Sequence, residues 1–481
     1  MDLNVFGRRE DNNMFERVVN FIKGAINKMF NTTDIAKDFN IDISASDETI
    51  KLIEKCASIF NNKAPWLNED VKSLNVAKTI CEKVAKAVTI EFKSQVDDEE
   101  IDRIYQRFIK NIRTNTEYTL GKGDMFFKPF YSNGKIKVSC IHADKFIPIK
   151  FDSTGELLSA IFIDQLTKGN DIYTRLEYQE LIDTTIIIKN LVYKTNKNNL
   201  NTLGSKISLD LIPEWKDIQE ETQIKNVNRL IGGYFKIPIA NPVDNTSQRG
   251  VPIFANAINT LEEIDKQFSR TLWEYEGSEL AIDIDELMLK RDENGNPIYP
   301  KGKERLYRNL DLDGEKTNKW NVFSPAIRDT ALFNGLNELL RECESQCGLS
   351  FGILSKETNI AKTATEINSS KQDYYVTVSD IQGSLQTALE DLVYGIDVLL
   401  TLYGIKHKTN PNVSFHWDDS ILVDTEKKRS QALVEKNADL IDDIQYFIET
   451  RDYSEEEAIE FVNKMKQRSP KEPIEQEEIE E

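Results

Sequence analysis

Apolar residues recur in steps of three and four along Val251–Gly277, a spacing that places them on one face of a helix. They are Phe254, Ile258, Leu261, Ile264, Phe268, Leu272 and Tyr275. The same spacing over Asp329–Cys347 predicts a second long helix, and Gly348 follows it as a C-terminal cap. The stretch between the two helices, roughly Glu279–Ala326, is turn-rich and β-like, with a hairpin tip at 293–297.

A third and longer helix is predicted to begin with the capping box Thr363–Glu366 and to end near Gly404. At about 1.5 Å per residue it would be roughly 60 Å long. We expect it to bend at Ser369-Ser370 and at Gly383. The segment before it, Gly348–Lys362, is longer than most helix–helix connections, and we interpret it as a flexible loop with a function.

The rest of the chain mixes helical and strand patterns, which predicts an α+β fold. Helices are expected at Met14–Phe30, Asp47–Phe60, Asn75–Lys93, Asp97–Thr114, Thr425–Lys436, Ile441–Thr450 and Glu455–Gln467. Strands are expected at Met125–Tyr131, Lys135–His142, Ile147–Ile149, Ser159–Gln165, Ile172–Ile182, Thr184–Tyr193, Tyr234–Ile239 and Val413–Trp417. Asn133-Gly134 is a typical hairpin turn because both residues tolerate positive φ.

Charge and composition narrow the function classes. The chain of 481 residues has 61 basic and 81 acidic residues and a net charge of −20, which argues against tight non-specific DNA binding over most of its surface. An acidic wall past which DNA slides is compatible with this charge. Five scattered cysteines form no disulfide framework and favour a reducing compartment. Charged residues interrupt Met14–Phe30, so it is read as an amphipathic helix, and no stretch has the length of a membrane span.

Two motifs that suggest metal binding are incomplete. Asn309, Asp311 and Asp313 match the start of an EF-hand loop, but the twelfth position is Trp320 where a bidentate Glu is required, so we interpret the segment as a turn. Cys343 and Cys347 are four residues apart, but no nearby ligand completes a site, and both fall on the apolar face of their helix. We therefore predict buried core thiols and no metal.

Catalytic motifs are equally weak. The three histidines, His142, His407 and His416, have no partner at a telling spacing. Gly121–Gly123 lacks the full pattern of a phosphate-binding loop, and Asp418-Asp419 is more typical of a helix start. The sequence therefore predicts a protein that is not an enzyme and needs no cofactor.

Several short stretches, in their order and spacing, resemble portal proteins of tailed bacteriophages, specifically those of long-tailed phages of Gram-positive hosts. These stretches are Tyr173–Glu177, Tyr234–Asn241, Gly250–Ile253 with Asp265, Thr363–Glu366 and Trp417–Ile421. The resemblance implies a portal-type multidomain subunit with long stem helices, a β-rich wing and clip, and a helical crown. In the division that this resemblance implies, the wing consists of N-terminal helices and a β meander in residues 1–240 and of a long helix and return strand in residues 363–424. The first stem helix is 241–277, the clip is 278–328 and the second stem helix is 329–347. The tunnel loop is 348–362, and the crown with an acidic C-terminal tail is 425–481.

The resemblance also implies a function. A ring, usually of twelve subunits, would stand at one vertex of the capsid, and double-stranded DNA would pass through it during packaging and ejection. The expected partners are further copies of the chain, the terminase large subunit, a head-completion or adaptor protein, and the major capsid and scaffolding proteins. The protein would be assembled in the host cytoplasm without contact with a membrane.

Two sets of site residues follow from the resemblance. The residues expected to face DNA from the tunnel loop are Ser350, Ser355, Lys356, Thr358, Asn359 and Lys362. Those expected at the clip interface are Asn294, Asn296, Asp311, Asp313 and Trp320. A non-viral structural or adaptor protein that oligomerises through the long helices is the second interpretation, and an acidic hydrolase is the third.

Overall fold

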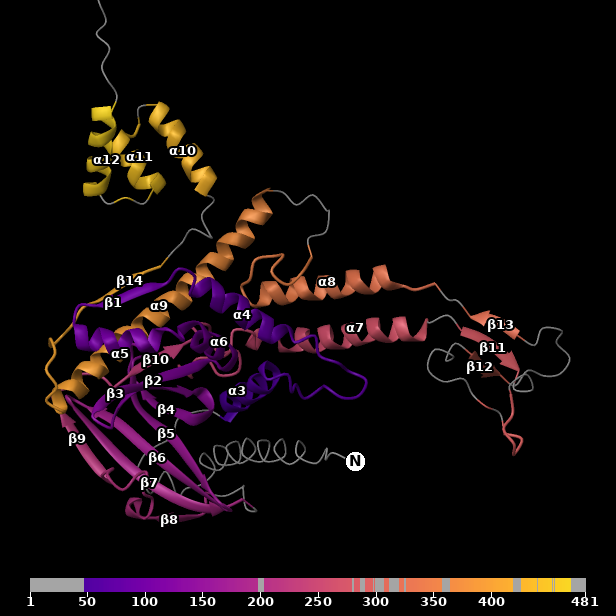
Figure 1. The fold of residues 1–481 in the computed structure, drawn as a ribbon, viewed down its shortest axis with the longest axis horizontal. Coiled ribbons are helices and arrows are strands. Elements are labelled where there is room, and N and C mark those ends of the chain that lie inside the picture. The colour runs from indigo at the N-terminus through magenta and orange to yellow at the C-terminus, as the bar shows by residue number, and fades with distance from the viewer. Residues whose placement is uncertain are drawn as a thin grey trace, which may run out of the picture. The chain divides into compact units, whose positions relative to one another are not determined.

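A computed structural model describes most of the chain from residue 47 onward, in two compact units, Met1–His416 and Trp417–Glu481 (Figure 1). The described residues are 47–197, 203–278, 281–285, 290–296, 298, 307–310, 320–323, 326–356, 364–417, 425–438, 440–451, 453 and 455–468. The side chains of residues 47, 281–285, 307–310, 320–323, 364–370, 425–429, 455–456 and 466–468 lie outside this description. The expected helix Met14–Phe30 also lies outside the described residues.

Helices and strands mix along the chain, so the predicted α+β class is confirmed. The α-helices are α3 (Asp47–Phe60), α4 (Val76–Val88), α5 (Glu99–Ile109), α6 (Ile112–Lys122), α7 (Ile258–Gly277), α8 (Asp329–Gln346), α9 (Ala364–Leu402), α10 (Thr425–Asn437), α11 (Asp443–Arg451) and α12 (Glu455–Arg468). The strands are β1 (Lys93–Val96), β2 (Asp124–Ser132), β3 (Lys135–His142), β4 (Phe146–Phe151), β5 (Leu157–Lys168), β6 (Asp171–Ile182), β7 (Thr185–Asn196), β8 (Ser205–Ile207), β9 (Glu221–Lys225), β10 (Gly233–Lys236), β11 (Ala281–Asp285), β12 (Tyr307–Leu310), β13 (Trp320–Phe323) and β14 (Val413–His416).

Two antiparallel sheets share a hydrophobic core. One has the order β10-β2-β3, and the other has the order β4-β5-β6-β7-β8, with β9 also paired to β7. The β2–β3 hairpin turns at Asn133-Gly134, both with positive φ, as the sequence predicted. Phe126 of β2 packs against Phe146 and Phe162 of the larger sheet, with ring centroids 5.9 and 4.9 Å apart. These aromatic contacts join the two sheets.

One of the expected N-terminal helices is divided into two in the structure. A single helix was expected over Asp97–Thr114, but the chain forms α5 and α6 with a break at Lys110-Asn111. α5 begins at Glu99, two residues after the expected start, and the Asp98 side chain caps it by accepting a hydrogen bond from the backbone N–H of Ile101. α6 then continues to Lys122 and ends on Gly123, whose φ of 95° only glycine adopts readily.

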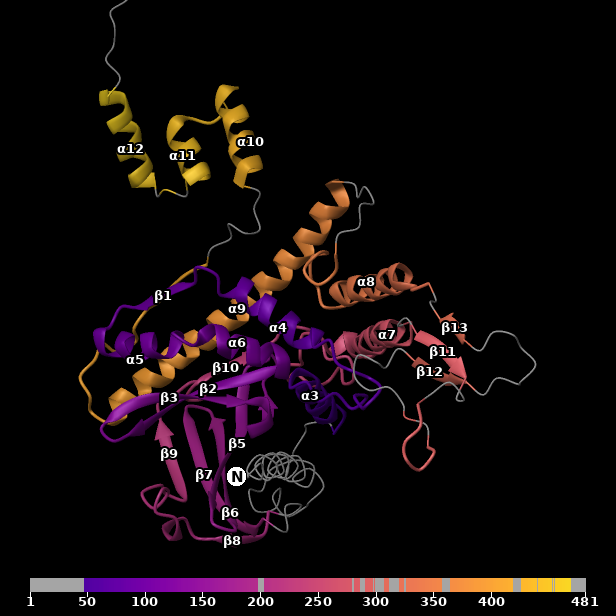
Figure 2. The same cartoon turned by 45° about the vertical axis from the view of Figure 1, so that its right-hand side comes forward.

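α7 and α8 lie side by side (Figure 1 and Figure 2). The expected start of the first helix at Val251 is wrong, because α7 begins at Ile258. Val251 precedes Pro252, which disfavours helical backbone at Val251, and residues 251–254 are instead buried as an irregular segment. At the other end of α7, the Glu274 carboxylate accepts hydrogen bonds from the Arg328 guanidinium, which links α7 to the residue before α8.

A loop from the N-terminal helices is fixed along α7. Asp265 accepts hydrogen bonds from the indole Nε1 of Trp66 at 2.9 Å and from the backbone N–H of Leu74 at 2.8 Å. Ser269, one turn further on, accepts a hydrogen bond from the backbone N–H of Lys72. Burial raises the pKa of the Asp265 carboxyl, although both hydrogen bonds oppose that change.

α9 packs across the β10-β2-β3 sheet (Figure 1). Its 39 residues form one helix that continues through Ser369-Ser370 and Gly383, where the sequence suggested bends. The chain then returns as β14, which pairs with β1 over Lys93–Val96, more than 300 residues away in the sequence. Lys93 is thus in a strand, contrary to the expected helix Asn75–Lys93, and α4 ends at Val88.

The insert between α7 and α8 contains a three-stranded sheet in the order β12-β11-β13, in agreement with the predicted β character. In the second compact unit, Phe447 of α11 and Ala458 and Val462 of α12 form a small core. None of the helices in the described part of the chain combines the length and the apolar character needed to span a membrane.

Candidate functional site

The segment after α8 opens with a well-formed helix cap. Gly348 has a φ of 65°, its N–H donates to the Ser345 carbonyl, and the N–H of Leu349 donates to the Glu344 carbonyl. This pair of hydrogen bonds is a Schellman motif, which reverses the chain direction at the end of a helix. The predicted cap at Gly348 is therefore confirmed, and Leu349 is buried beneath it.

The chain then folds back onto α8 and is held by two side chains of that helix. The Glu344 carboxylate accepts hydrogen bonds from the backbone N–H groups of Gly352, Leu354 and Ser355, at 3.1, 2.5 and 2.9 Å. Asn337 Oδ1 accepts from the N–H of Lys356 at 2.7 Å, and Asn337 Nδ2 donates to the Lys356 carbonyl at 3.1 Å. The first part of the predicted flexible loop is therefore an ordered, hydrogen-bonded segment.

The residues predicted to face DNA differ in their exposure in the structure. Ser350 is half-buried, and Lys356 is exposed. Ser355 is only 7% exposed, and its hydroxyl donates to Glu344 Oε2 at 2.7 Å, so this hydroxyl faces α8. Thr358, Asn359 and Lys362 lie outside the described residues, as does Thr363 of the expected capping box.

The residues predicted at the clip interface are described only in part. Asn294 and Asn296 lie on an exposed turn, where the Asp292 carboxylate accepts hydrogen bonds from both backbone N–H groups. The N–H of Asp292 donates to the Asn296 carbonyl and closes the hairpin tip that the sequence predicted. Trp320 is the first residue of β13, but its side chain is outside the described residues, and so are Asp311 and Asp313.

Two cysteines of α8 and its cap and one histidine of β3 are shielded from solvent to different degrees. Cys343 and Cys347 are buried, as predicted, and the hydrogen bond that the Cys347 thiol makes to Cys343, together with burial, raises the pKa of Cys347 well above its usual value. Burial and the nearby Lys122 lower the pKa of His142 to about 4, so this imidazole is neutral at pH 7. Over the described ranges, no three His, Cys, Asp or Glu side chains group as metal ligands.

His407 forms a local contact at the C-terminal end of α9. Its Nε2 lies 2.7 Å from Asp397 Oδ1, and its Nδ1 lies 2.7 Å from the Ile405 carbonyl. Burial alone would lower the pKa of His407, but the carbonyl and the carboxylate together raise it. His416, in β14, pairs in register with Lys93, and Asp418 and Asp419 lie outside the described residues.

A cleft that the sequence did not indicate, with a volume of about 740 Å³, lies between the β4–β5 turn, β10 and α9. Arg229 on its wall forms an ion pair with Asp391 of α9. Ser384 of α9 donates a hydrogen bond to the Lys236 carbonyl at 2.6 Å, so two residues that line the cleft join α9 to β10.

Sequence reasoning also missed Glu344 and Asn337. A signal was present at Glu344, because a carboxylate in the last turn of a helix lies near the negative end of the helix dipole. Such a residue is unfavourable unless hydrogen-bond donors surround it, as they do here. Asn337 carries no comparable signal, since an asparagine on a helix surface is common.

Comparison with known proteins identifies the family of this chain, with its long paired helices, antiparallel sheets and folded-back segment. Residues 68–469 match the family model of phage portal proteins, so the chain belongs to that family. The matching model is the one described as phage portal protein, SPP1 Gp6-like. Portal proteins are structural components of the phage capsid and head–tail connector and act in DNA packaging. No curated protein matches the chain.

Proposed function

We propose that this chain is the subunit of a dodecameric ring at one capsid vertex, through which double-stranded DNA enters during packaging and leaves during ejection. The family match over residues 68–469 carries this proposal. In it, residues 1–240 form the wing, α7 and α8 the stem, 278–328 the clip, 348–362 the tunnel loop and 425–481 the crown. The long helix and return strand, 363–424, complete the wing.

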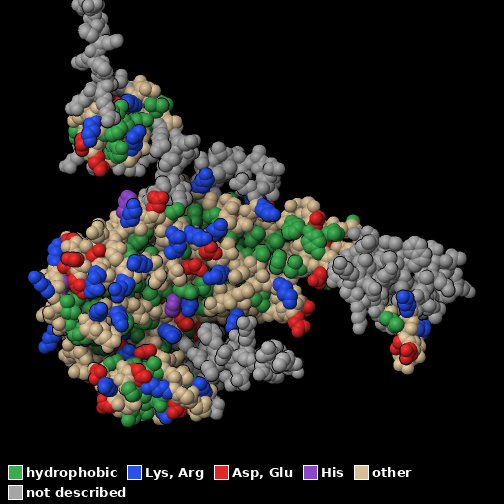
Figure 3. Space-filling view, in the orientation of Figure 1, with side chains coloured by type: hydrophobic (Ala, Val, Ile, Leu, Met, Phe, Trp, Pro, Cys, Tyr) green, Lys and Arg blue, Asp and Glu red, His purple; other side chains and the backbone are tan. Residues whose placement is uncertain are grey.

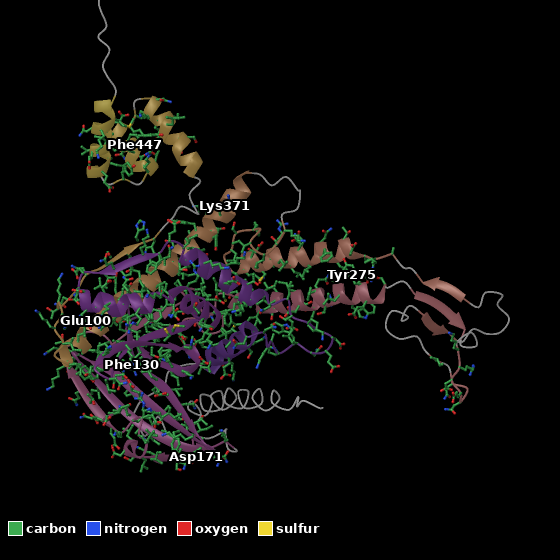
Figure 4. The ribbon with its side chains drawn as sticks, viewed as in Figure 1. Glu100, Phe130, Asp171, Tyr275, Lys371 and Phe447 are labelled. Atoms are coloured by element: carbon green, nitrogen blue, oxygen red, sulfur yellow. The ribbon has the colours of Figure 1, made fainter. Side chains whose placement is uncertain are left out.

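The outer half of the stem supports assembly into a ring. Leu272, Trp273 and Tyr275 of α7 are 39, 68 and 40% exposed, and Phe333 of α8 is 46% exposed. Figure 3 shows hydrophobic side chains gathered on the visible face of these helices, and Figure 4 labels Tyr275 among them. Large apolar side chains grouped in this way mark an interaction surface. In a ring, a neighbouring stem covers them.

The proposed partners follow from this arrangement. The clip, with Asn294, Asn296, Asp311, Asp313 and Trp320, meets the terminase large subunit during packaging and a head-completion or adaptor protein afterwards. The wing meets the major capsid and scaffolding proteins. The chain itself acts without catalysis or cofactor, so the ATPase that drives packaging is a separate protein, and assembly takes place in the host cytoplasm.

Mass measurement tests the ring. Expressed together with a scaffolding protein, chains of 55.3 kDa should assemble into particles of about 0.66 MDa with a central hole in electron micrographs. Trp273→Ala should lower the fraction of chains that assemble, because it removes apolar area that a neighbouring stem would bury in the ring. Leu211→Ala, which changes a residue of the wing that is 67% exposed, should leave assembly unchanged. A chain that stays monomeric under these conditions contradicts the proposal.

A further inference from the structure

Glu344 and Asn337 form a pair of anchors on one face of α8. They are seven residues apart, which is close to two helical turns, so both side chains point to the same side. The segment 349–356 runs back over this side after the cap at Gly348. Lys356 therefore lies beside Asn337, about 15 Å along the helix from its C-terminal end.

The environment of Glu344 indicates that its carboxylate stabilises the folded-back segment. It is fully buried, and a buried carboxylate is costly unless donors satisfy its oxygens. Three backbone N–H groups of the segment and the Ser355 hydroxyl supply those donors. Backbone donors of this kind are available only while the segment keeps its folded-back shape, since they come from residues 352, 354 and 355 together. The carboxylate and the shape of the segment thus depend on each other.

Asn337 holds the other end of the segment. Its amide both accepts from and donates to the backbone of Lys356, which fixes that residue through its main chain and leaves the charged side chain exposed. Between the two anchors, the Arg341 guanidinium lies over the Phe351 ring at 5.3 Å. Three side chains of α8 at intervals of three and four residues therefore contact the segment along its length.

We propose that Glu344 and Asn337 are positioning residues that hold residues 349–356 against α8 and so fix the point at which Lys356 meets the DNA. This inference rests on the proposed function for the role of Lys356, while the anchoring itself does not. The segment is then a rigid part of the channel wall, and its contact with DNA is set by the stem helix.

Hydrogen exchange of the assembled protein tests the anchoring. Glu344→Ala should raise the exchange rates of the Leu354 and Ser355 amides roughly tenfold or more, because each loses its acceptor, and that of the Gly352 amide less, because it keeps the Ser355 hydroxyl at 3.3 Å. Glu342→Ala is the matched control. It removes the same charge from an exposed position two residues away, and it should leave these amides protected. Unchanged exchange in Glu344→Ala overturns the anchoring.

DNA packaging into capsids with the same variants tests positioning. Glu344→Ala rings of normal mass and thermal stability should package DNA roughly tenfold less efficiently than Glu342→Ala rings. Glu344→Gln, which keeps an acceptor oxygen, should recover part of the loss. Faster exchange with normal packaging by Glu344→Ala would overturn the positioning role. If the wild-type protein packages no DNA, the proposed function fails, and the exchange experiment still decides the anchoring.

A second variant keeps the proposal testable if Glu344→Ala does not fold. Asn337→Ala removes an amide on the helix surface and should leave α8 intact. It should raise exchange at the Lys356 amide alone and lower packaging in the same direction as Glu344→Ala. Exchange and packaging both equal to those of the wild type would overturn the role of Asn337.

Discussion

Glu177 lies at the centre of a buried charge cluster in the six-stranded sheet. Its carboxylate is 2.5 Å from Lys128 Nζ and 2.9 Å from Arg175 Nη1, and it also accepts a hydrogen bond from Gln179. Burial opposes ionisation of Glu177, but the two cations outweigh it and lower its pKa to about 2. Burial also lowers the pKa of Lys128, so each charge of the pair depends on the other.

Because the pKa of Glu177 is low, the wild type and a Glu177→Gln variant should differ in stability by an amount that depends on pH. Since the folded-state pKa lies below the ordinary value of 4.5, the stabilisation is complete above about pH 4.5 and is lost as the pH falls towards 2. Glu177→Gln should therefore lower the free energy of unfolding at pH 7 by about 3 kcal/mol, and this deficit should shrink below pH 4.5. Chemical unfolding of both proteins between pH 7 and 3 measures this deficit.

An exposed pair provides the control. Glu214→Gln removes the partner of Lys168 on the surface of the same sheet, where solvent screens the pair, and should change stability little at any pH. A deficit in Glu177→Gln that stays constant down to pH 3 would show that the loss comes from packing and not from ionisation.

At the scale of single residues, the sequence predicted those positions whose chemistry is local. Gly348 as a helix cap and Asn133-Gly134 as a hairpin turn follow from backbone preferences that neighbouring residues reveal. Ser355 was expected to face DNA because the resemblance places it in the tunnel loop. Its hydroxyl instead binds Glu344, eleven residues earlier, and no local pattern in the sequence reports that contact.

At the scale of elements, two glycines determine how the chain enters α7. A Cβ on Gly250 would lie 2.4 Å from the Gly123 carbonyl oxygen and 2.9 Å from Lys236 Cβ. Gly123 caps α6, and its carbonyl also accepts a hydrogen bond from the N–H of Ile237. The end of α6, the end of β10 and the segment before α7 therefore meet at a point with no room for a side chain.

Gly250→Ala should consequently lower the free energy of unfolding by about 2 kcal/mol, because backbone must move to admit the methyl group. Gly383→Ala is the matched control, since Gly383 is exposed inside α9 with open space around its Cβ position. Alanine favours the helix there, so the control should stabilise by about 0.5–1 kcal/mol. Thermal unfolding of both variants measures the difference, and equal effects would contradict the crowding at Gly250.

The elements themselves were largely predictable, but their pairing was not. α3 and β3 have the bounds that periodicity predicted. β9 was missed because its five residues carry only one buried apolar side chain, Ile224. The pairing of β1 with β14 joins segments over 300 residues apart, and short-range patterns contain no information about such a contact.

At the scale of the whole molecule, net charge and local charge have different roles. A net charge of −20 per chain would make the proposed ring strongly acidic, and an acidic channel wall would repel DNA and prevent adhesion. Lys356 is an exposed cation on a segment whose backbone is fixed to α8. In the proposed channel, a few cations held at one level would make phosphate contacts that exchange readily as DNA moves.

This view predicts that Lys356→Glu combined with Lys362→Glu leaves ring assembly intact and lowers DNA packaging roughly tenfold. Assembly should survive because Asn337 holds Lys356 through its main chain, which the substitution does not alter. Packaging should fall because carboxylates now face the phosphates. DNA protected from nuclease inside capsids measures the effect, with Lys150→Glu as a control of like charge at an exposed position of the wing. Packaging at the wild-type level by the double variant would remove both lysines from the mechanism.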